Sequence, residues 1–408
     1  MRTKGSDTYI VKVKGSTIPF QERVAEPQIT STPWHTLRMS SGNPAKDSNK
    51  YPRQDFSINA SYPNVKQVWR RADNTDIGAG AVQSGKYVVY ANTSGIVYAL
   101  DAATGRELWK YATGGKIFST PAVYGKGDAA SVIIGSCDKN IYSLNIKTGK
   151  VNWKYECGKS VLGSPTIYGG KVYIGSSDNT FRALNAKTGK LVWENREIKG
   201  FIEAKPFVDK QQVVIGDWAN TLYSFNPANG KLQWKWEKKG SRMLSPAAVW
   251  PIKANGNIIF ATPERVTYGL DAKTGKQLWR VYGGRESVGL SPDGQNYYVK
   301  VMKDSVFMFA TKLAPGAEKP VKVWGANAEF GYEIAPTPIT SVPQGGKDNK
   351  GLVFIPTDKG NIVALNHADG SIAWKHKVSF ALINYIQPLA GNRLLVSTMD
   401  GIVTVLEY

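Results

Sequence analysis

The stretch NAKTGKLVW (Asn185 to Trp193) is one of six copies of a nine-residue motif. The motif has Asp or Asn first, Gly fifth, usually Lys sixth and Trp ninth. The other copies are DAATGRELW (Asp101 to Trp109), NIKTGKVNW (Asn145 to Trp153), NPANGKLQW (Asn226 to Trp234), DAKTGKQLW (Asp271 to Trp279) and NHADGSIAW (Asn366 to Trp374). A period of about 40 to 50 residues indicates stacked supersecondary units that share one continuous core.

Tryptophans outside the motif copies extend the register to eight units. Trp69 precedes the first copy, and Trp324 lies between the fifth and sixth copies. Burial of one aromatic side chain of this size contributes about 2 to 3 kcal/mol. We therefore expect the register tryptophans to pack between neighbouring units: Trp69, Trp109, Trp153, Trp193, Trp234, Trp279, Trp324 and Trp374.

Each unit has the composition of four short strands. In one unit, β-branched and aromatic stretches occur at Ser164 to Tyr168, Val172 to Gly175, Thr180 to Leu184 and Leu191 to Glu194. Eight such units predict an all-β fold, an eight-bladed β-propeller of four-stranded blades. The motif then forms the turn between the third and fourth strands, where Gly takes positive φ and the Asp or Asn side chain accepts hydrogen bonds from turn amides.

The two ends of the repeat complement each other. LLVSTMDGIVTVLEY (Leu394 to Tyr408) matches the second and third strands of a blade and lacks a fourth strand. NVKQVWR (Asn64 to Arg70) has the pattern of an isolated fourth strand, and we expect Asp76 to Val82 to be the next inner strand. Pairing of the N- and C-terminal strands would close the ring and remove exposed sheet edges.

The residues before the repeat have a different composition. Residues 1–60 are rich in Ser, Pro and Asn, and we expect at most one short strand there, Thr8 to Val13. We interpret them as an extension or linker at the end of an upstream region, followed by the propeller at residues 61–408. The propeller would then be the C-terminal module of a larger protein, whose signal segment is missing from this chain. No apolar run approaches the roughly 20 residues of a transmembrane helix.

The motif in YALDAATGRELW and RALNAKTGKLVW resembles the repeat of pyrroloquinoline-quinone-type propellers. That family includes quinoprotein dehydrogenases, the lipoprotein of the outer-membrane β-barrel assembly machinery, and propeller modules attached to calcineurin-like metallophosphoesterases. The resemblance implies the fold and, for the assembly lipoprotein, a role in binding partners. It does not imply one activity.

The resemblance to the dehydrogenases would also imply a vicinal Cys-Cys disulfide over the quinone, with Glu and Asn on calcium and a catalytic Asp. The two cysteines here, Cys137 and Cys157, are not adjacent. Strand spacing places them about 10 Å apart, beyond disulfide reach, so we expect two free thiols. We therefore expect no quinone and no other cofactor.

Other catalytic chemistry lacks the necessary residues. The three histidines, His35, His367 and His376, are scattered and form no metal-binding motif. Nucleophile motifs and phosphate-binding glycine loops are missing as well. We expect no catalytic or metal-binding residues in this chain. The alternatives are a quinone-dependent dehydrogenase and an accessory domain of a metallophosphoesterase whose catalytic domain lies upstream.

Charge gives the remaining functional indication. The chain has 52 Lys and Arg against 32 Asp and Glu, a net charge of +20. Five blades carry a cation directly after the motif glycine, and propeller symmetry would gather these on one basic rim: Arg106, Lys150, Lys190, Lys231 and Lys276. Such a rim can be a solvated surface that aids solubility, or it can dock an acidic protein, a lipid headgroup or a glycan phosphate. Nucleic acid is the least favoured partner.

Loops from each outer strand to the next inner strand would surround the funnel on the opposite face. These loops differ between blades, which is where specificity can reside, although ordinary solvated loops would look the same. The candidate partner-binding residues are Lys116, Lys159, Glu203, Arg242, Arg285, Tyr332, Glu333 and Tyr385. The sequence thus predicts a non-enzymatic, monomeric binding or scaffold propeller in the periplasm or outside the cell, whose partner is a protein or an anionic envelope component.

Overall fold

The computed structural model describes residues 8–13, 16–21, 65–73, 75–237, 250–285, 288–331 and 338–408. The chain forms two compact units, Met1–Phe56 and Ser57–Tyr408. The first contains an antiparallel hairpin of β1 (Thr8–Val13) and β2 (Ser16–Gln21). The expectation of at most one strand before residue 60 was therefore wrong, because STIPFQ carries enough β-forming residues to pair with β1.

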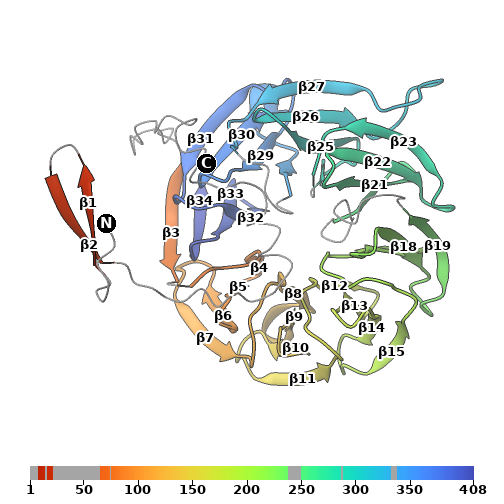
Figure 1. Ribbon diagram of the computed structural model, residues 1–408, viewed down its shortest axis with the longest axis horizontal. Coiled ribbons are helices and arrows are strands. Elements are labelled where there is room, and N and C mark those ends of the chain that lie inside the picture. Colours follow the sequence, from red (N-terminus) through yellow and green to blue (C-terminus); the bar gives the residue numbers. More distant parts are fainter. Residues whose placement is uncertain are drawn as a thin grey trace. The chain divides into compact units, whose positions relative to one another are not determined.

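The second unit is a ring of eight four-stranded antiparallel sheets, each running from the centre outward (Figure 1). With the innermost strand first, blade 1 contains β4 (Val82–Ser84), β5 (Tyr87–Ala91), β6 (Ile96–Asp101) and β7 (Glu107–Ala112), and blade 2 contains β8 (Ala122–Tyr124), β9 (Ser131–Gly135), β10 (Asn140–Asn145) and β11 (Val151–Glu156). Blade 3 contains β12 (Thr166–Tyr168), β13 (Lys171–Gly175), β14 (Phe181–Asn185) and β15 (Leu191–Asn195). Blade 4 contains β16 (Phe207–Val208), β17 (Val213–Gly216), β18 (Thr221–Phe225) and β19 (Leu232–Glu237).

Blades 5 to 8 follow the same order: β20 (Ile252–Ala254), β21 (Asn257–Thr262), β22 (Val266–Asp271) and β23 (Gln277–Tyr282); β24 (Gly289–Leu290), β25 (Asn296–Val301), β26 (Ser305–Ala310) and β27 (Lys322–Asn327); β28 (Thr340–Val342), β29 (Leu352–Pro356), β30 (Asn361–Asn366) and β31 (Ile372–Lys377); β32 (Ile383–Leu389), β33 (Arg393–Thr398), β34 (Ile402–Glu407) and β3 (Lys66–Ala72). Within the described ranges, the 3-10 turns η1 (Gly127–Ala129) and η4 (Lys347–Asn349) lie in loops. The predicted all-β, eight-bladed fold is confirmed.

The ring closes through β3, which pairs antiparallel with β34 and completes blade 8. Trp69 lies opposite Val405 in this register, and the hydroxyl of Thr404 donates to the carbonyl of Trp69 at 2.6 Å. The predicted pairing of the N- and C-terminal strands is therefore confirmed. The two ends of the repeat hold one sheet together instead of presenting two open edges.

The innermost strands are shorter than predicted. β4 spans Val82–Ser84, whereas the sequence indicated a strand from Asp76 to Val82. The loop amides before β4 bond to side chains instead of a strand partner. The amide of Gly80 donates to Thr120 Oγ1 at 3.0 Å, and that of Ala81 donates to Ser397 Oγ at 3.2 Å. These bonds join blade 1 to blades 2 and 8 near the ring centre.

The apolar core lies between adjacent blades. Second and third strands are buried on both faces, as in YVVYA of β5, where all five residues are buried. Fourth strands are mostly exposed, as in VNWKYE of β11, where Trp153 is the one buried residue. Sheets covered on both faces carry continuous apolar runs, whereas a perimeter strand needs only one buried anchor. The tryptophan is that anchor.

Candidate interaction surfaces

Each repeated turn is built against the tryptophan of the preceding blade. Gly189 has φ +70°, and a Cβ atom there would lie 2.6 Å from the Trp153 ring. The Trp153 indole Nε1 donates to the carbonyl of Ala186 in the same turn at 3.1 Å. Asn185 Oδ1 accepts the amides of Lys187 and Thr188, which fixes the turn. Glycine is thus required by backbone conformation and by ring contact together.

The same arrangement recurs around the ring. The pairs of tryptophan and following turn glycine are Trp69 with Gly105, Trp109 with Gly149, Trp153 with Gly189, Trp193 with Gly230, Trp234 with Gly275, and Trp324 with Gly370. Their indole donors bond to the carbonyls of Ala102, Ile146, Ala186, Pro227, Ala272 and His367. Trp374 instead faces the chain end, with its ring 5.5 Å from that of Tyr408.

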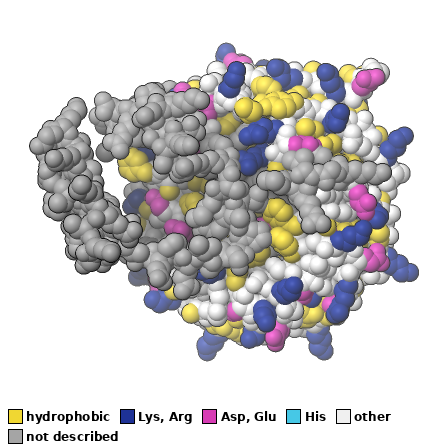
Figure 2. Space-filling model, viewed as in Figure 1, with side chains coloured by type: hydrophobic (Ala, Val, Ile, Leu, Met, Phe, Trp, Pro, Cys, Tyr) yellow, Lys and Arg dark blue, Asp and Glu magenta, His cyan; other side chains and the backbone are white. Residues whose placement is uncertain are grey.

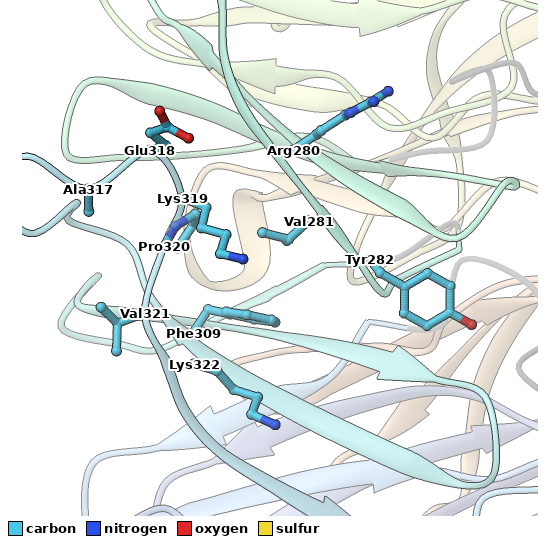
Figure 3. A pocket seen from close by; sticks show the side chains of 10 residues that line it. All are labelled: Arg280, Val281, Tyr282, Phe309, Ala317, Glu318, Lys319, Pro320, Val321 and Lys322. Atoms are coloured by element: carbon cyan, nitrogen blue, oxygen red, sulfur yellow. The ribbon is translucent and has the colours of Figure 1, made fainter.

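The seam between blades 5 and 6 is irregular because residues 311–321 replace the tight turn. Trp279 Nε1 is buried there and has no acceptor among the described residues. Its ring stacks on Tyr297 with centroids 5.9 Å apart. A groove of about 780 Å³ opens beside this loop, and Figure 3 shows Lys319 extending toward Val281 across it. The groove combines apolar walls with basic side chains.

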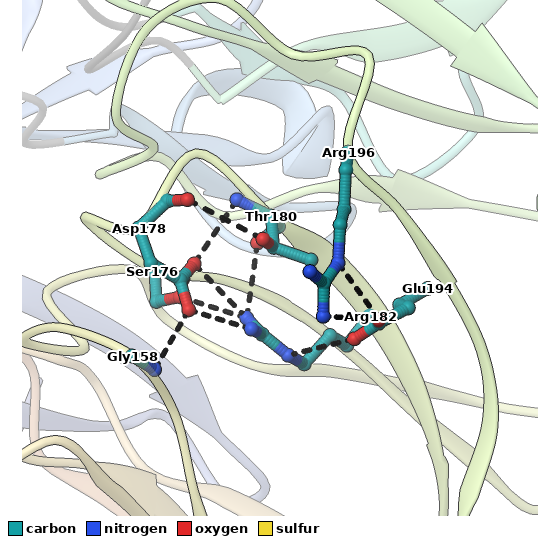
Figure 4. A network of polar contacts seen from close by, with 7 residues as sticks. All are labelled: Gly158, Ser176, Asp178, Thr180, Arg182, Glu194 and Arg196. Atoms are coloured by element: carbon teal, nitrogen blue, oxygen red, sulfur yellow. Dashed lines mark hydrogen bonds and ion pairs between the residues drawn. The ribbon is translucent and has the colours of Figure 1, made fainter.

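A second set of contacts holds the turns between second and third strands, on the opposite face. In blade 3, Arg182 and Asp178 form an ion pair at 2.6 Å, with side chains 6% and 11% exposed (Figure 4). Asp178 Oδ2 also accepts the amide of Gly158 in the preceding loop at 2.9 Å. Burial alone would raise the pKa of Asp178, but bonds from Arg182, Ser176 and Gly158 outweigh it and lower that pKa to about 2.

Neighbouring blades place tyrosine where blade 3 has Arg182. In blade 2, the Tyr142 hydroxyl donates to Asp138 Oδ2 at 2.6 Å; in blade 4, the Tyr223 hydroxyl donates to Asp217 Oδ2 at 3.0 Å. The sequence analysis did not predict these contacts of the turn carboxylates with tyrosine or arginine. The sequence does contain a pattern that could have indicated them: Gly114 and Gly158 each lie five residues after a register tryptophan. The amide of each glycine donates to a carboxylate of the next blade, Asp138 or Asp178.

The predicted basic rim lies at the turns between third and fourth strands of five consecutive blades. Its five members are all exposed: Arg106, Lys150, Lys190, Lys231 and Lys276. None has an ion pair with another described residue. Figure 2 shows Lys and Arg side chains spread around the perimeter of the molecule. These side chains therefore extend into solvent.

The described members of the predicted funnel set differ in exposure. Lys159 is exposed, and Lys116 and Arg285 are half-buried. Glu203 is 9% exposed, and its carboxylate accepts a hydrogen bond from the indole N–H of Trp218 at 3.0 Å, so this side chain makes an internal contact. Tyr385 lines the central cavity. The remaining candidates lie outside the described residues: Arg242, Tyr332 and Glu333.

The central cavity has a volume of about 530 Å³ and is lined by inner-strand residues of blades 3 to 8. Lys205 places its ammonium 5.4 Å from the centre of the Trp250 ring, which lies 6.2 Å from the ring of Tyr385. Burial lowers the pKa of Lys205 and raises that of Tyr385. Sequence analysis did not single out Lys205 or Trp250, although Trp250 stands outside the tryptophan register.

The cysteines and the metal-binding residue types were predicted to form no site. Cys137 and Cys157 are both free, as expected from their strand positions, and burial raises the pKa of each thiol to about 11. No group of three or more His, Cys, Asp or Glu side chains is arranged to hold a metal ion in the described parts of the chain. Among the same residues, no helix is long and apolar enough to span a membrane.

One family model matches residues 56–127, 127–237 and 202–347, and it describes outer membrane protein assembly factor BamB. The chain belongs to this BamB family. Its repeats therefore have the family's sequence pattern across most of the ring, in agreement with the resemblance to quinone-type propellers. No curated protein sequence matches the chain.

Solved structures share the fold. BamB from Moraxella catarrhalis is 19% identical with a TM-score of 0.65, over 84% of this chain and 98% of that one. The computationally designed protein Ika8 is 17% identical with a TM-score of 0.66, over 84% and 100%. Quinohemoprotein alcohol dehydrogenase ADHIIG from Pseudomonas putida HK5 is 13% identical with a TM-score of 0.64, over 86% and 77%. At these identities the likeness concerns the fold alone.

Proposed function

We propose that this BamB-family chain is a non-enzymatic binding and scaffold propeller of the cell envelope, acting in the periplasm or outside the cell on a protein or an anionic envelope component. One observation carries the proposal. The Trp, Gly and Asp or Asn of the motif are used by turns and seams, whereas the motif cation is exposed in five blades without an ion pair among the described residues. The family description, a protein assembly factor, supports a binding role.

Photo-crosslinking in cells tests the binding role. A photoreactive amino acid would replace Lys116, Lys159 or Arg285 on the funnel face. Val192, which is 43% exposed on the outer strand of blade 3, serves as the control position. A scaffold predicts one or more discrete protein adducts from the funnel positions and none from the control. Equal labelling at all four positions would count against a dedicated funnel surface.

The likeness in fold to ADHIIG makes a quinone-dependent dehydrogenase the second candidate. Its test is direct. Pyrroloquinoline quinone and Ca²⁺ are added to the purified chain, and thermal melting is followed together with the visible spectrum. We expect no change in melting temperature. A saturable rise, abolished by Trp250→Ala in the central cavity, would replace the scaffold proposal with the dehydrogenase.

A further inference from the structure

The turns at the two ends of the blades differ in charge. Successive turns of an antiparallel blade lie at opposite ends of its strands, so the turns between third and fourth strands share one face. In blades 1 to 5 these turns hold two carboxylates, Asp101 and Asp271, and eight cations: Arg106, Lys147, Lys150, Lys187, Lys190, Lys231, Lys273 and Lys276. We call this the basic face.

The turns between second and third strands lie on the other face and have the reverse balance. Their described residues include seven carboxylates: Asp138, Asp178, Asp217, Glu264, Asp304, Asp358 and Asp400. Four cations accompany them: Lys139, Arg265, Lys303 and Lys359. In these two sets of turns, cations therefore predominate at one end of the blades and carboxylates at the other.

Most cations of the basic face have no ion pair among the described residues. Of the eight, Lys147 alone has an ion pair among the described residues, with Asp128 at 3.2 Å. The turns that carry them are rigid: Asn145 Oδ1, for example, accepts the amides of Lys147 and Thr148, both at 3.0 Å. Because the turn and the blade both repeat, the cations after the motif glycine occupy equivalent positions along the ring axis. Docking onto a flat anionic surface would therefore require little reordering of the backbone.

We propose that the basic face docks the propeller onto an anionic phospholipid bilayer, with the carboxylate-bearing turns between second and third strands directed away from it. Equivalent positions on five consecutive blades suit a planar surface of lipid phosphates better than one acidic peptide, which would reach few blades at once. Cations near such a surface act additively, and the charge difference between the two sets of turns orients the molecule on approach. This inference names a partner for the proposed binding role and rests on it.

Vesicle sedimentation tests the proposal with the full chain. Vesicles of phosphatidylcholine alone are compared with vesicles containing about one-third phosphatidylglycerol, at low and at physiological ionic strength. The basic-face variant combines Arg106→Gln, Lys150→Gln, Lys190→Gln, Lys231→Gln and Lys276→Gln. The matched control removes the same charge from the other face through Lys116→Gln, Lys139→Gln, Lys159→Gln, Lys199→Gln and Lys303→Gln. Unchanged melting temperatures establish that both variants fold.

We expect binding to the anionic vesicles alone, weakened by salt, reduced at least about 100-fold in the basic-face variant and only slightly in the control. Equal losses in the two variants, or no binding to anionic vesicles, would overturn the proposal. If vesicle binding is unaffected in the basic-face variant while a photoreactive residue at position 190 yields a discrete protein adduct in cells, the face belongs to a protein partner, and membrane docking is wrong. The funnel crosslinks do not depend on this result, so the binding role can stand when membrane docking fails.

Discussion

The turns at the two ends of each blade use their charges in opposite ways. Between second and third strands, carboxylates are held by buried partners, as Asp178 is by Arg182 and by the amide of Gly158. Between third and fourth strands, cations such as Lys190 extend into solvent, and the turn is held by glycine and tryptophan instead. Charged side chains make internal contacts at one end and are exposed at the other. Mutations should separate the two.

The largest loss of stability is expected for Arg182→Ala. Removing the guanidinium leaves the Asp178 carboxylate buried without its countercharge, which costs about 3 to 5 kcal/mol. Urea unfolding followed by tryptophan fluorescence measures this change. Arg182→Tyr is the matched control, because it copies the Tyr142 and Asp138 pair of blade 2. It should recover most of the loss. Equal destabilisation by Ala and Tyr would show that the tyrosine arrangement does not transfer between blades.

Gly189→Ala probes the other end of the same blade. The substitution forces a side chain to φ +70° and 2.6 Å from the Trp153 ring, so we expect a loss of about 3 kcal/mol. Gly170→Ala is the control, since Gly170 has φ +72° and a methyl group added there would have nothing within 4 Å. That variant should lose about 1 kcal/mol. Similar urea midpoints for both would mean that backbone strain alone, and not the tryptophan, selects glycine.

The repeat allowed the sequence to predict what is local to each unit. The motif residues Gly189 and Asn185 indicated the turn, Trp153 indicated the seam, and the incomplete ends indicated the closing pair of β3 and β34. Each of these follows from a residue type in a fixed register. The same reasoning failed for Asp76 to Val82, because side chains of other blades take the hydrogen bonds that a strand partner would have taken.

The candidate site was less predictable because its contacts join distant loops. Asp178 accepts the amide of Gly158 from the loop of the preceding blade, and no local sequence pattern predicts which carboxylate will bond to which amide. Glu203 was predicted to face a partner, yet the structure buries it beside Trp218. Lys205 and Trp250 meet in the central cavity from different blades. Such pairs depend on how blades are spaced around the ring, which the motif does not encode.

Acid should first weaken the turns between second and third strands, where Asp178 lies. The folded pKa of Asp178 is about 2, below its unfolded value near 3.9, so its contribution is fully present above about pH 4 and is lost as pH falls toward 2. The lowered pKa of Asp178 contributes about 2 kcal/mol to the free energy of unfolding at neutral pH. Urea midpoints measured between pH 5 and pH 2 should fall less steeply in Asp178→Asn than in the unmodified chain, although the variant starts lower. Parallel curves would place the acid-sensitive group elsewhere.

The smallest effect on stability is expected from the basic-face variant. Lys190 and its four counterparts are exposed and lack ion pairs within the described parts of the chain, and exposed substitutions of this kind change stability by less than about 0.5 kcal/mol each. Removal of like charges from one face can even stabilise slightly, because their mutual repulsion is relieved. Urea unfolding at low and high salt measures both. A loss comparable to that of Gly189→Ala would show that these cations are structural, and the distinction between the two ends of the blades would fail.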